Sequence, residues 1–148
     1  MNLNKWFNLK YEVIYFYNVY GPKQITNSKM SAVIAIFCKQ YLNKKPLTVV
    51  SPGTQSRRFT HVKDTVEGCY VAWKNNKNQH YLISYSKSYL IKKVAKLFSK
   101  NIKYIQKRKG ERLESAVIKS IRGKKIIKLP CKIALEDYVN DFKKKVLT

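Results

Sequence analysis

The sequence predicts a mixed α/β fold in which short strands alternate with amphipathic helices. Residues 11–17 form a nearly continuous apolar run, typical of a strand covered on both faces in a parallel sheet. Residues 30–41 instead place apolar side chains at i, i+3, i+4, i+7, i+8 and i+11, which is the spacing of a helix. A polar Asn-x-Tyr-Gly-Pro turn follows the predicted strand and precedes the predicted helix, so the sequence indicates a strand, a turn and a helix in succession.

Further strands are predicted from short β-branched or alternating segments that end at polar or proline-containing turns. These segments are 47–50, 57–62, 80–84 and 102–105. The residues before the first strand, 1–10, have the spacing of the tail of an amphipathic helix.

Three more helices are predicted from capping residues and apolar spacing. Asp64 and Glu67 form a capping box, so we expect a helix to begin there. Ser88 is expected to cap the next helix, and a last helix presents Leu135 and Phe142 on one apolar face.

The composition bounds the class of protein. A chain of 148 residues with 45% hydrophobic residues is long enough for one domain with a core. No apolar run approaches the roughly 20 residues that span a bilayer, and the cysteines Cys38, Cys69 and Cys131 have no CxxC spacing. We therefore expect a cytoplasmic protein without membrane contact, disulfide framework or bound metal.

The formal net charge of +23 invites a nucleic-acid interpretation. However, 26 of the 31 basic residues are Lys and only 5 are Arg, whereas a groove-reading surface favours Arg. The lysines are also spread along the whole chain. Nucleic acid is thus not the favoured partner, but a non-catalytic basic module that binds nucleic acid or another polyanion stays open as the alternative.

Most catalytic signatures are missing from the sequence. The five glycines have no two members within ten residues of each other, which excludes a glycine-rich phosphate loop. His61 and His80 have no Cys or carboxylate at ligand spacing, and the three Tyr-xxx-Lys pairs are about as many as chance supplies. The positive signals favour anion binding. Asn18 follows a parallel strand at its carboxyl end, and Arg57 and Arg108 each sit at a strand edge or turn.

Five segments in order resemble the carboxyl-terminal half of the extended short-chain dehydrogenase/reductases, and within them the NAD-dependent nucleotide-sugar epimerases and dehydratases of the UDP-glucose 4-epimerase type. The matching segments are 15–22, 45–50, 57–64, 108–111 and 132–138. The resemblance implies the last strands of a Rossmann-like NAD-binding sheet joined to a small α/β substrate-binding domain. Residues 1–29 would be the end of the Rossmann-like portion, and residues 30–148 mostly the substrate-binding domain.

The resemblance also implies a site for a UDP- or dTDP-sugar. Asn18 would contact its diphosphate or sugar, and Arg57 and Arg108 would clamp the diphosphate from two sides. The base pocket would be lined, through backbone and apolar contacts, by Thr48, Val49 and Val50.

The family's glycine-rich cofactor turn and catalytic Tyr-xxx-Lys couple precede the matching segments, so we expect the amino-terminal cofactor half to be missing. NAD would serve the complete enzyme and would not bind this chain alone, which would be inactive. Its partners would be the missing half, from the same gene or a split one, and a second copy in a family-like homodimer. Which sugar is bound, and whether the activity is epimerase or dehydratase, stays open.

Overall fold

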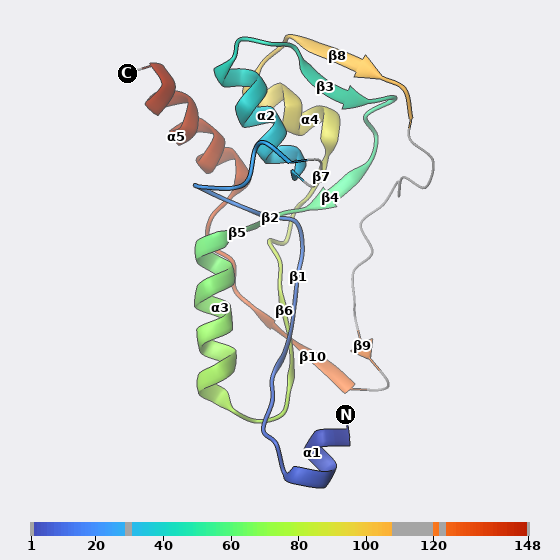
Figure 1. Ribbon diagram of the computed structural model, residues 1–148, viewed down its shortest axis with the longest axis vertical. Coiled ribbons are helices and arrows are strands. Elements are labelled where there is room, and N and C mark those ends of the chain that lie inside the picture. The colour runs from blue at the N-terminus through green and yellow to red at the C-terminus, as the bar shows by residue number, and fades with distance from the viewer. Residues whose placement is uncertain (1, 29–30, 108–119, 122–123, 148) are drawn as a thin grey trace.

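The computed structural model describes residues 2–28, 31–107, 120–121 and 124–147. It is elongated, and the two ends of the described chain lie at opposite ends of its long axis (Figure 1). The helices are α1 (Asn2–Phe7), α2 (Val33–Leu42), α3 (Val62–Asn75), α4 (Ile91–Phe98) and α5 (Leu135–Leu147). The strands are β1 (Val13–Phe16), β2 (Val19–Tyr20), β3 (Leu47–Val50), β4 (Ser56–Arg58), β5 (Thr60–His61), β6 (His80–Ile83), β7 (Ser88–Leu90), β8 (Ile102–Ile105), β9 (Ser120–Ile121) and β10 (Lys124–Leu129).

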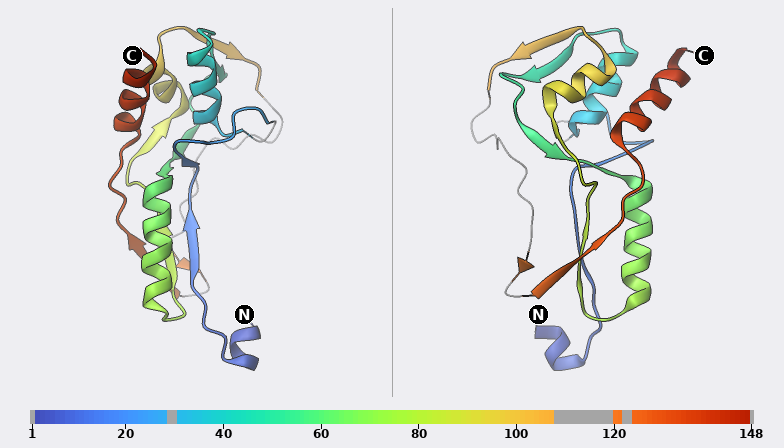
Figure 2. Two further views of the ribbon diagram at one scale, coloured as in Figure 1. Left: turned by 60° about the vertical axis from the view of Figure 1, so that its left-hand side comes forward. Right: turned by 180° about the vertical axis from the view of Figure 1, so that it is seen from behind.

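One half of the molecule is a four-stranded sheet in the order β1-β6-β10-β9, with α3 running alongside it (Figures 1 and 2). β6 pairs in parallel with both β1 and β10, which confirms the prediction of a parallel sheet. Gly68 brings α3 close to this sheet, because a Cβ at that position would lie 2.4 Å from Ile83 Cδ1. Parallel strands with a helix packed alongside are what the predicted Rossmann-like portion requires.

The other half contains α2, α4, α5 and the parallel pair β3–β8 (Figure 1). Its core is a cluster of buried apolar side chains from α2, α4, α5 and β3, including Phe37, Leu47, Val49, Phe98 and Val139, and β8 adds partly buried Ile102 at its margin. The rings of Phe37 and Phe98 meet edge to face with centroids 5.9 Å apart. This aromatic packing fixes α2 against α4.

Two short pairs connect the halves. β2 pairs in parallel with β5, and β4 pairs antiparallel with β7. The chain therefore passes several times between the two halves, and α3, β6 and β10 all return to the sheet that contains β1 (Figure 1). A division of the chain into domains at residue 29 stays a prediction. The sheet that contains β1 also includes β6 and β10, which come from much later in the chain.

The expectation that residues 11–17 are covered on both faces is wrong for this chain. β1 lies at the edge of its sheet, with β6 as its only strand neighbour among the described residues. Its residues are half-buried or exposed, and the Phe16 side chain is 51% exposed.

Both predicted caps are also wrong. α3 begins at Val62, because His61 is its N-cap and accepts a hydrogen bond from the Lys63 amide through Nδ1 at 3.2 Å. Asp64 lies in the first turn instead, where its carboxylate accepts hydrogen bonds from the backbone amides of Lys132 and Ile133, each at 3.1 Å. Ser88 is part of β7, and α4 begins only at Ile91.

β2, β7, β9 and β10 were not predicted from the sequence: β2 falls in the predicted turn and β7 where a helix was expected to begin. In β10 the short apolar pair Ile126–Ile127 is flanked by lysines, which hides the strand pattern. The other predicted strands and helices are confirmed with small shifts of their ends.

Candidate functional site

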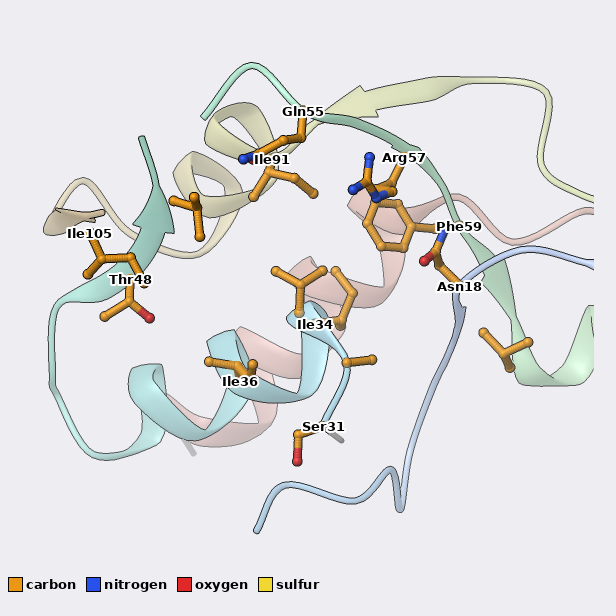
Figure 3. Close-up of a pocket in the computed structure, with 14 residues that line it drawn as sticks. Asn18, Ser31, Ile34, Ile36, Thr48, Gln55, Arg57, Phe59, Ile91 and Ile105 are labelled. Carbon is orange, nitrogen blue, oxygen red and sulfur yellow. The ribbon is translucent and has the colours of Figure 1, made fainter. Parts of the chain in front are cut away.

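A cavity of about 260 Å³ lies where α2, β3, β4 and β8 meet. Four of the six predicted site residues line it: Asn18, Thr48, Val50 and Arg57. They come from separate segments, so the fold has brought together positions that are up to 39 residues apart in the chain, counted from Asn18 to Arg57 (57 − 18). In Figure 3, Asn18 and Arg57 lie at one end of the cavity, and Thr48 and Ile105 lie at the other.

Asn18 lies in the short turn between β1 and β2 and is held in a left-handed conformation with φ of 38°. Asparagine is among the residues that tolerate this region of backbone space. Its Nδ2 donates a hydrogen bond to the carbonyl oxygen of Arg58 at 2.7 Å. The turn after β1 is therefore fastened to β4 at Arg58, the residue after Arg57.

Arg57 lies on β4, and its Nη1 donates a hydrogen bond to the Ser56 carbonyl oxygen at 2.7 Å. In the β4–β7 pair it stands opposite Tyr89, whose ring packs against that of Phe59 with centroids 6.1 Å apart. The Arg57 guanidinium carries a permanent positive charge at one end of an otherwise largely apolar cavity (Figure 3). An anionic group of a ligand is stabilised most at this end.

The strand that carries Tyr89 is anchored to α5. The Tyr89 hydroxyl donates a hydrogen bond to Glu136 Oε2 at 2.5 Å, and Lys87 forms an ion pair with the same carboxylate. Burial alone would raise the pKa of Glu136, but the hydrogen bonds from Lys87 and Tyr89 outweigh burial and lower it. The carboxylate therefore stays ionised at neutral pH and keeps β7 in place behind Arg57.

Thr48 is oriented by α2. Its hydroxyl accepts a hydrogen bond from Gln40 Nε2 at 2.8 Å, and its amide donates one to Gln40 Oε1 at 3.0 Å. With its oxygen engaged as an acceptor, the Thr48 hydroxyl has its proton left to donate. Val49 points the other way: its side chain is 1% exposed and belongs to the core cluster. Only its backbone could take part in a site here.

Arg108 lies outside the described residues, so its place in the predicted diphosphate clamp stays a prediction.

Gln55 also lines the cavity and is not one of the predicted site residues. Its side chain is 1% exposed, and its Nε2 has no hydrogen-bond partner within residues 2–28, 31–107, 120–121 and 124–147. A signal was present, because extending the alternation of 57–62 back by two residues places Gln55 on the same face as Arg57 and Phe59. Glutamine in a polar turn usually indicates exposure, which hid this position.

A second cavity, of about 410 Å³, shares no lining residue with the first and lies against α5. Cys38 and Tyr138 are among its residues. Burial raises the pKa of the Cys38 thiol to about 11 and that of the Tyr138 phenol to about 12. Both groups are protonated at neutral pH, which makes them unsuited to act as nucleophile or base.

Within the described parts of the chain, no three His, Cys, Asp or Glu side chains are grouped so that they could hold a metal ion. A search of the same residues finds no helix with the length and apolar character needed to cross a bilayer.

Comparison with solved structures identifies the fold. A UDP-N-acetylglucosamine 4-epimerase from Methanobrevibacter ruminantium superposes with a TM-score of 0.80 at 24% identity, covering 97% of this chain and 49% of that one. A UDP-glucose 4-epimerase from Thermotoga maritima superposes with a TM-score of 0.77 at 22% identity, covering 99% of this chain and 50% of that one. The chain thus spans about half the length of these proteins, and its α/β fold, with parallel sheets, is that of their Rossmann-like structures.

Two curated relatives are more similar in sequence over shorter stretches. An uncharacterized UDP-glucose epimerase of Bacillus subtilis is 39% identical over 62 residues, which are 42% of this chain and 18% of that protein. UDP-glucuronic acid decarboxylase 4 of Arabidopsis thaliana is 35% identical over 68 residues, which are 46% of this chain and 15% of that protein. The family model of the NAD dependent epimerase/dehydratase family matches residues 2–84, more than half of the 148. The chain belongs to the NAD-dependent epimerase/dehydratase family.

Proposed function

We propose that this chain is the substrate-binding, carboxyl-terminal part of an NAD-dependent nucleotide-sugar epimerase or dehydratase of the UDP-glucose 4-epimerase kind. The observation that carries the proposal is the convergence of Asn18, Thr48, Val50 and Arg57 on one cavity. The sequence alone predicts each of these residues as a site residue, although they lie in separate segments of the chain. The names of the curated relatives, which refer to UDP-glucose and UDP-glucuronic acid, support a UDP-sugar as the ligand, with a dTDP-sugar as the nearest variant.

The shape and charge of the cavity fit one end of such a ligand. Its volume of about 260 Å³ lies just below the roughly 300–1,000 Å³ of pockets that enclose a whole drug-sized molecule. It therefore suits a base and its ribose, with the diphosphate extending out of the cavity past Asn18 and Arg57. Arg108 is proposed as the second arginine on that diphosphate.

NAD chemistry is not assigned to residues of this chain. Its five glycines are too far apart to form a cradle for a dinucleotide pyrophosphate, so we propose that the chain alone binds no NAD and catalyses no reaction. The part proposed for it is to bind and orient the sugar nucleotide.

Binding of UDP-glucose to the purified chain, measured by ligand-detected NMR, tests the proposal. Replacing Arg57 by Leu should weaken binding about tenfold or more, because hydrogen bonds to charged groups contribute about 1.5–3 kcal/mol. Arg58→Leu is the matched control, since Arg58 is the adjacent residue on β4 and does not line the cavity. Equal binding by the Arg57 and Arg58 variants would refute the site.

The alternative, a basic module for nucleic acid or another polyanion, gains no support from the comparisons. It predicts that duplex DNA, single strands and polyphosphate compete with UDP-glucose and that all binding falls steeply with salt. The proposed function predicts competition by UDP and by UDP-sugars alone.

A further inference from the structure

We propose that Gln55 selects the nucleotide base: its side-chain amide donates a hydrogen bond to a ring carbonyl, so the site takes keto pyrimidines such as uracil and rejects cytosine. This inference rests on the proposed function and adds a specificity-determining residue to it.

Gln55 is unusual among the residues that line the cavity because its amide nitrogen is buried with no partner in the part of the chain that the structure describes. Its side chain is 1% exposed, and Nε2 makes no hydrogen bond to any described residue. Leaving a buried donor unpaired costs about 1–3 kcal/mol, so folded proteins rarely do so without compensation. A ligand that brings an acceptor into the cavity would remove that cost, provided that the amide turns toward it.

The backbone around Gln55 is held firmly, which restricts where its side chain can reach. Its carbonyl oxygen accepts a hydrogen bond from the Ile91 amide at 2.9 Å, and the Gly53 carbonyl accepts one from the Lys92 amide at 3.0 Å. Gly53 has a φ of 75°, and a Cβ there would lie 2.8 Å from Val49 Cγ1. The turn before β4 is thus fixed between the start of α4 and β3, with Gln55 facing the cavity.

The surroundings of the side chain favour a base over a sugar or phosphate. In Figure 3 the Gln55 side chain extends over Ile91 and away from Arg57, toward the end of the cavity where Thr48 and Ile105 lie. The aliphatic residues in this region can cover the faces of a flat ring, but they offer no partners to the several hydroxyls of a sugar. Thr48 and Gln55 then present their donors to the edge of that ring.

Both donors point to the same chemistry. Uracil and thymine carry a carbonyl oxygen at C4, whereas cytosine carries an amino group that is itself a donor. With Nε2 as the atom that faces the ligand, the carboxamide N–H pairs with the carbonyl but meets the cytosine amino group donor to donor; cytosine would fit only if the amide turned over to present Oε1. A site built around a hydrogen bond rejects an analogue that cannot form it.

UDP and CDP are the suitable probes because they carry the same phosphates, so the charge of the protein acts equally on both. Dissociation constants for each would be measured by ligand-detected NMR on the full 148-residue chain and on Gln55→Leu, together with the thermal unfolding of each protein without ligand. Gln24→Leu is the matched control, since Gln24 also has an unpartnered amide atom, Oε1, but lines the second cavity.

The proposal expects the native chain to bind UDP at least fivefold more tightly than CDP. Gln55→Leu should weaken UDP binding about two- to tenfold, abolish the preference over CDP, and raise the unfolding temperature, because an unpaired buried donor has been removed. A merely structural glutamine would lower both stability and binding of the two nucleotides together. Gln24→Leu should leave the preference for UDP unchanged.

Two results overturn the inference and are distinguishable from each other. If the native chain binds UDP and CDP equally, or if Gln55→Leu keeps the preference, Gln55 does not read the base, while the proposed function stands. If the native chain binds neither nucleotide at millimolar concentration, both the inference and the proposed function of this chain are wrong.

Discussion

Replacing Asp64 by Asn should destabilise the chain strongly although the two side chains have almost the same shape. Asp64 is 3% exposed, and its two carboxylate oxygens each accept one backbone hydrogen bond, from Lys132 and from Ile133. An amide group has one oxygen and one NH₂ group. In the variant, one of the two backbone donors must therefore face another donor.

The magnitude follows from these contacts. Hydrogen bonds to a charged group contribute about 1.5–3 kcal/mol, and an unpaired buried N–H costs about 1–3 kcal/mol. Because these effects overlap in one interaction, we expect Asp64→Asn to lower the free energy of unfolding by about 2–3 kcal/mol. For a chain of this size each kcal/mol corresponds to roughly 2–4 °C, which gives a fall in Tm of about 5–10 °C.

The assay is urea and thermal unfolding followed by far-ultraviolet circular dichroism. Tryptophan fluorescence is a poor probe here, because Trp6 and Trp73 are already 71% and 70% exposed in the folded chain. Asp141→Asn is the matched control, since Asp141 is an exposed residue of α5. We expect it to change stability by less than about 0.5 kcal/mol. An Asp64→Asn variant as stable as this control would refute the reasoning.

Three further predictions concern a close contact, a titrating cap and a buried thiol. Gly68→Ala should lower stability by about 1–3 kcal/mol in urea unfolding, because the new methyl group would lie 2.4 Å from Ile83 Cδ1 and overpacking outweighs the better helix propensity of alanine. Burial lowers the pKa of His61, so the unfolded chain binds the proton more readily and stability should fall as pH decreases below about 6.5. His61→Asn keeps an oxygen that can cap Lys63 and should show a smaller fall between pH 7 and pH 5, measured as Tm. Iodoacetamide should modify Cys38 slowly until the chain is unfolded, because the thiol is buried and burial raises its pKa to about 11, and mass spectrometry of the labelled peptides measures the rate.

The elements predicted well from the sequence are those whose pattern is local. The apolar spacing of 30–41 and the β-branched segment 47–50 correspond to α2 and β3, because each segment buries one continuous face against the same core. Caps and edge strands depend on distant residues. Asp64 has the spacing of a capping residue, but its partners are 68 and 69 residues away, and no local rule contains them.

The candidate site was predicted in part for a similar reason. Family resemblance supplied Asn18, Thr48, Val50 and Arg57, and the fold brings them to one cavity. The same resemblance could not show that Val49 faces the core, which follows from the alternation of side chains along β3. It also passed over Gln55, since burial of a glutamine depends on how β4 packs against α4 and not on its own sequence neighbours.

Asp64 and Gln55 show how burial alone fails to distinguish a structural polar residue from a ligand-binding one. Both side chains are almost fully buried. The acceptors of Asp64 are satisfied by the backbone of another segment, so the fold itself accounts for the aspartate. The Nε2 donor of Gln55 finds no partner among the described residues, although it borders a cavity that has a cationic end and an apolar end. The fold thus pairs the Asp64 carboxylate completely but keeps the Gln55 amide nitrogen unpaired, which lowers its stability. We infer that a ligand with a suitable acceptor offsets this loss when it enters the cavity.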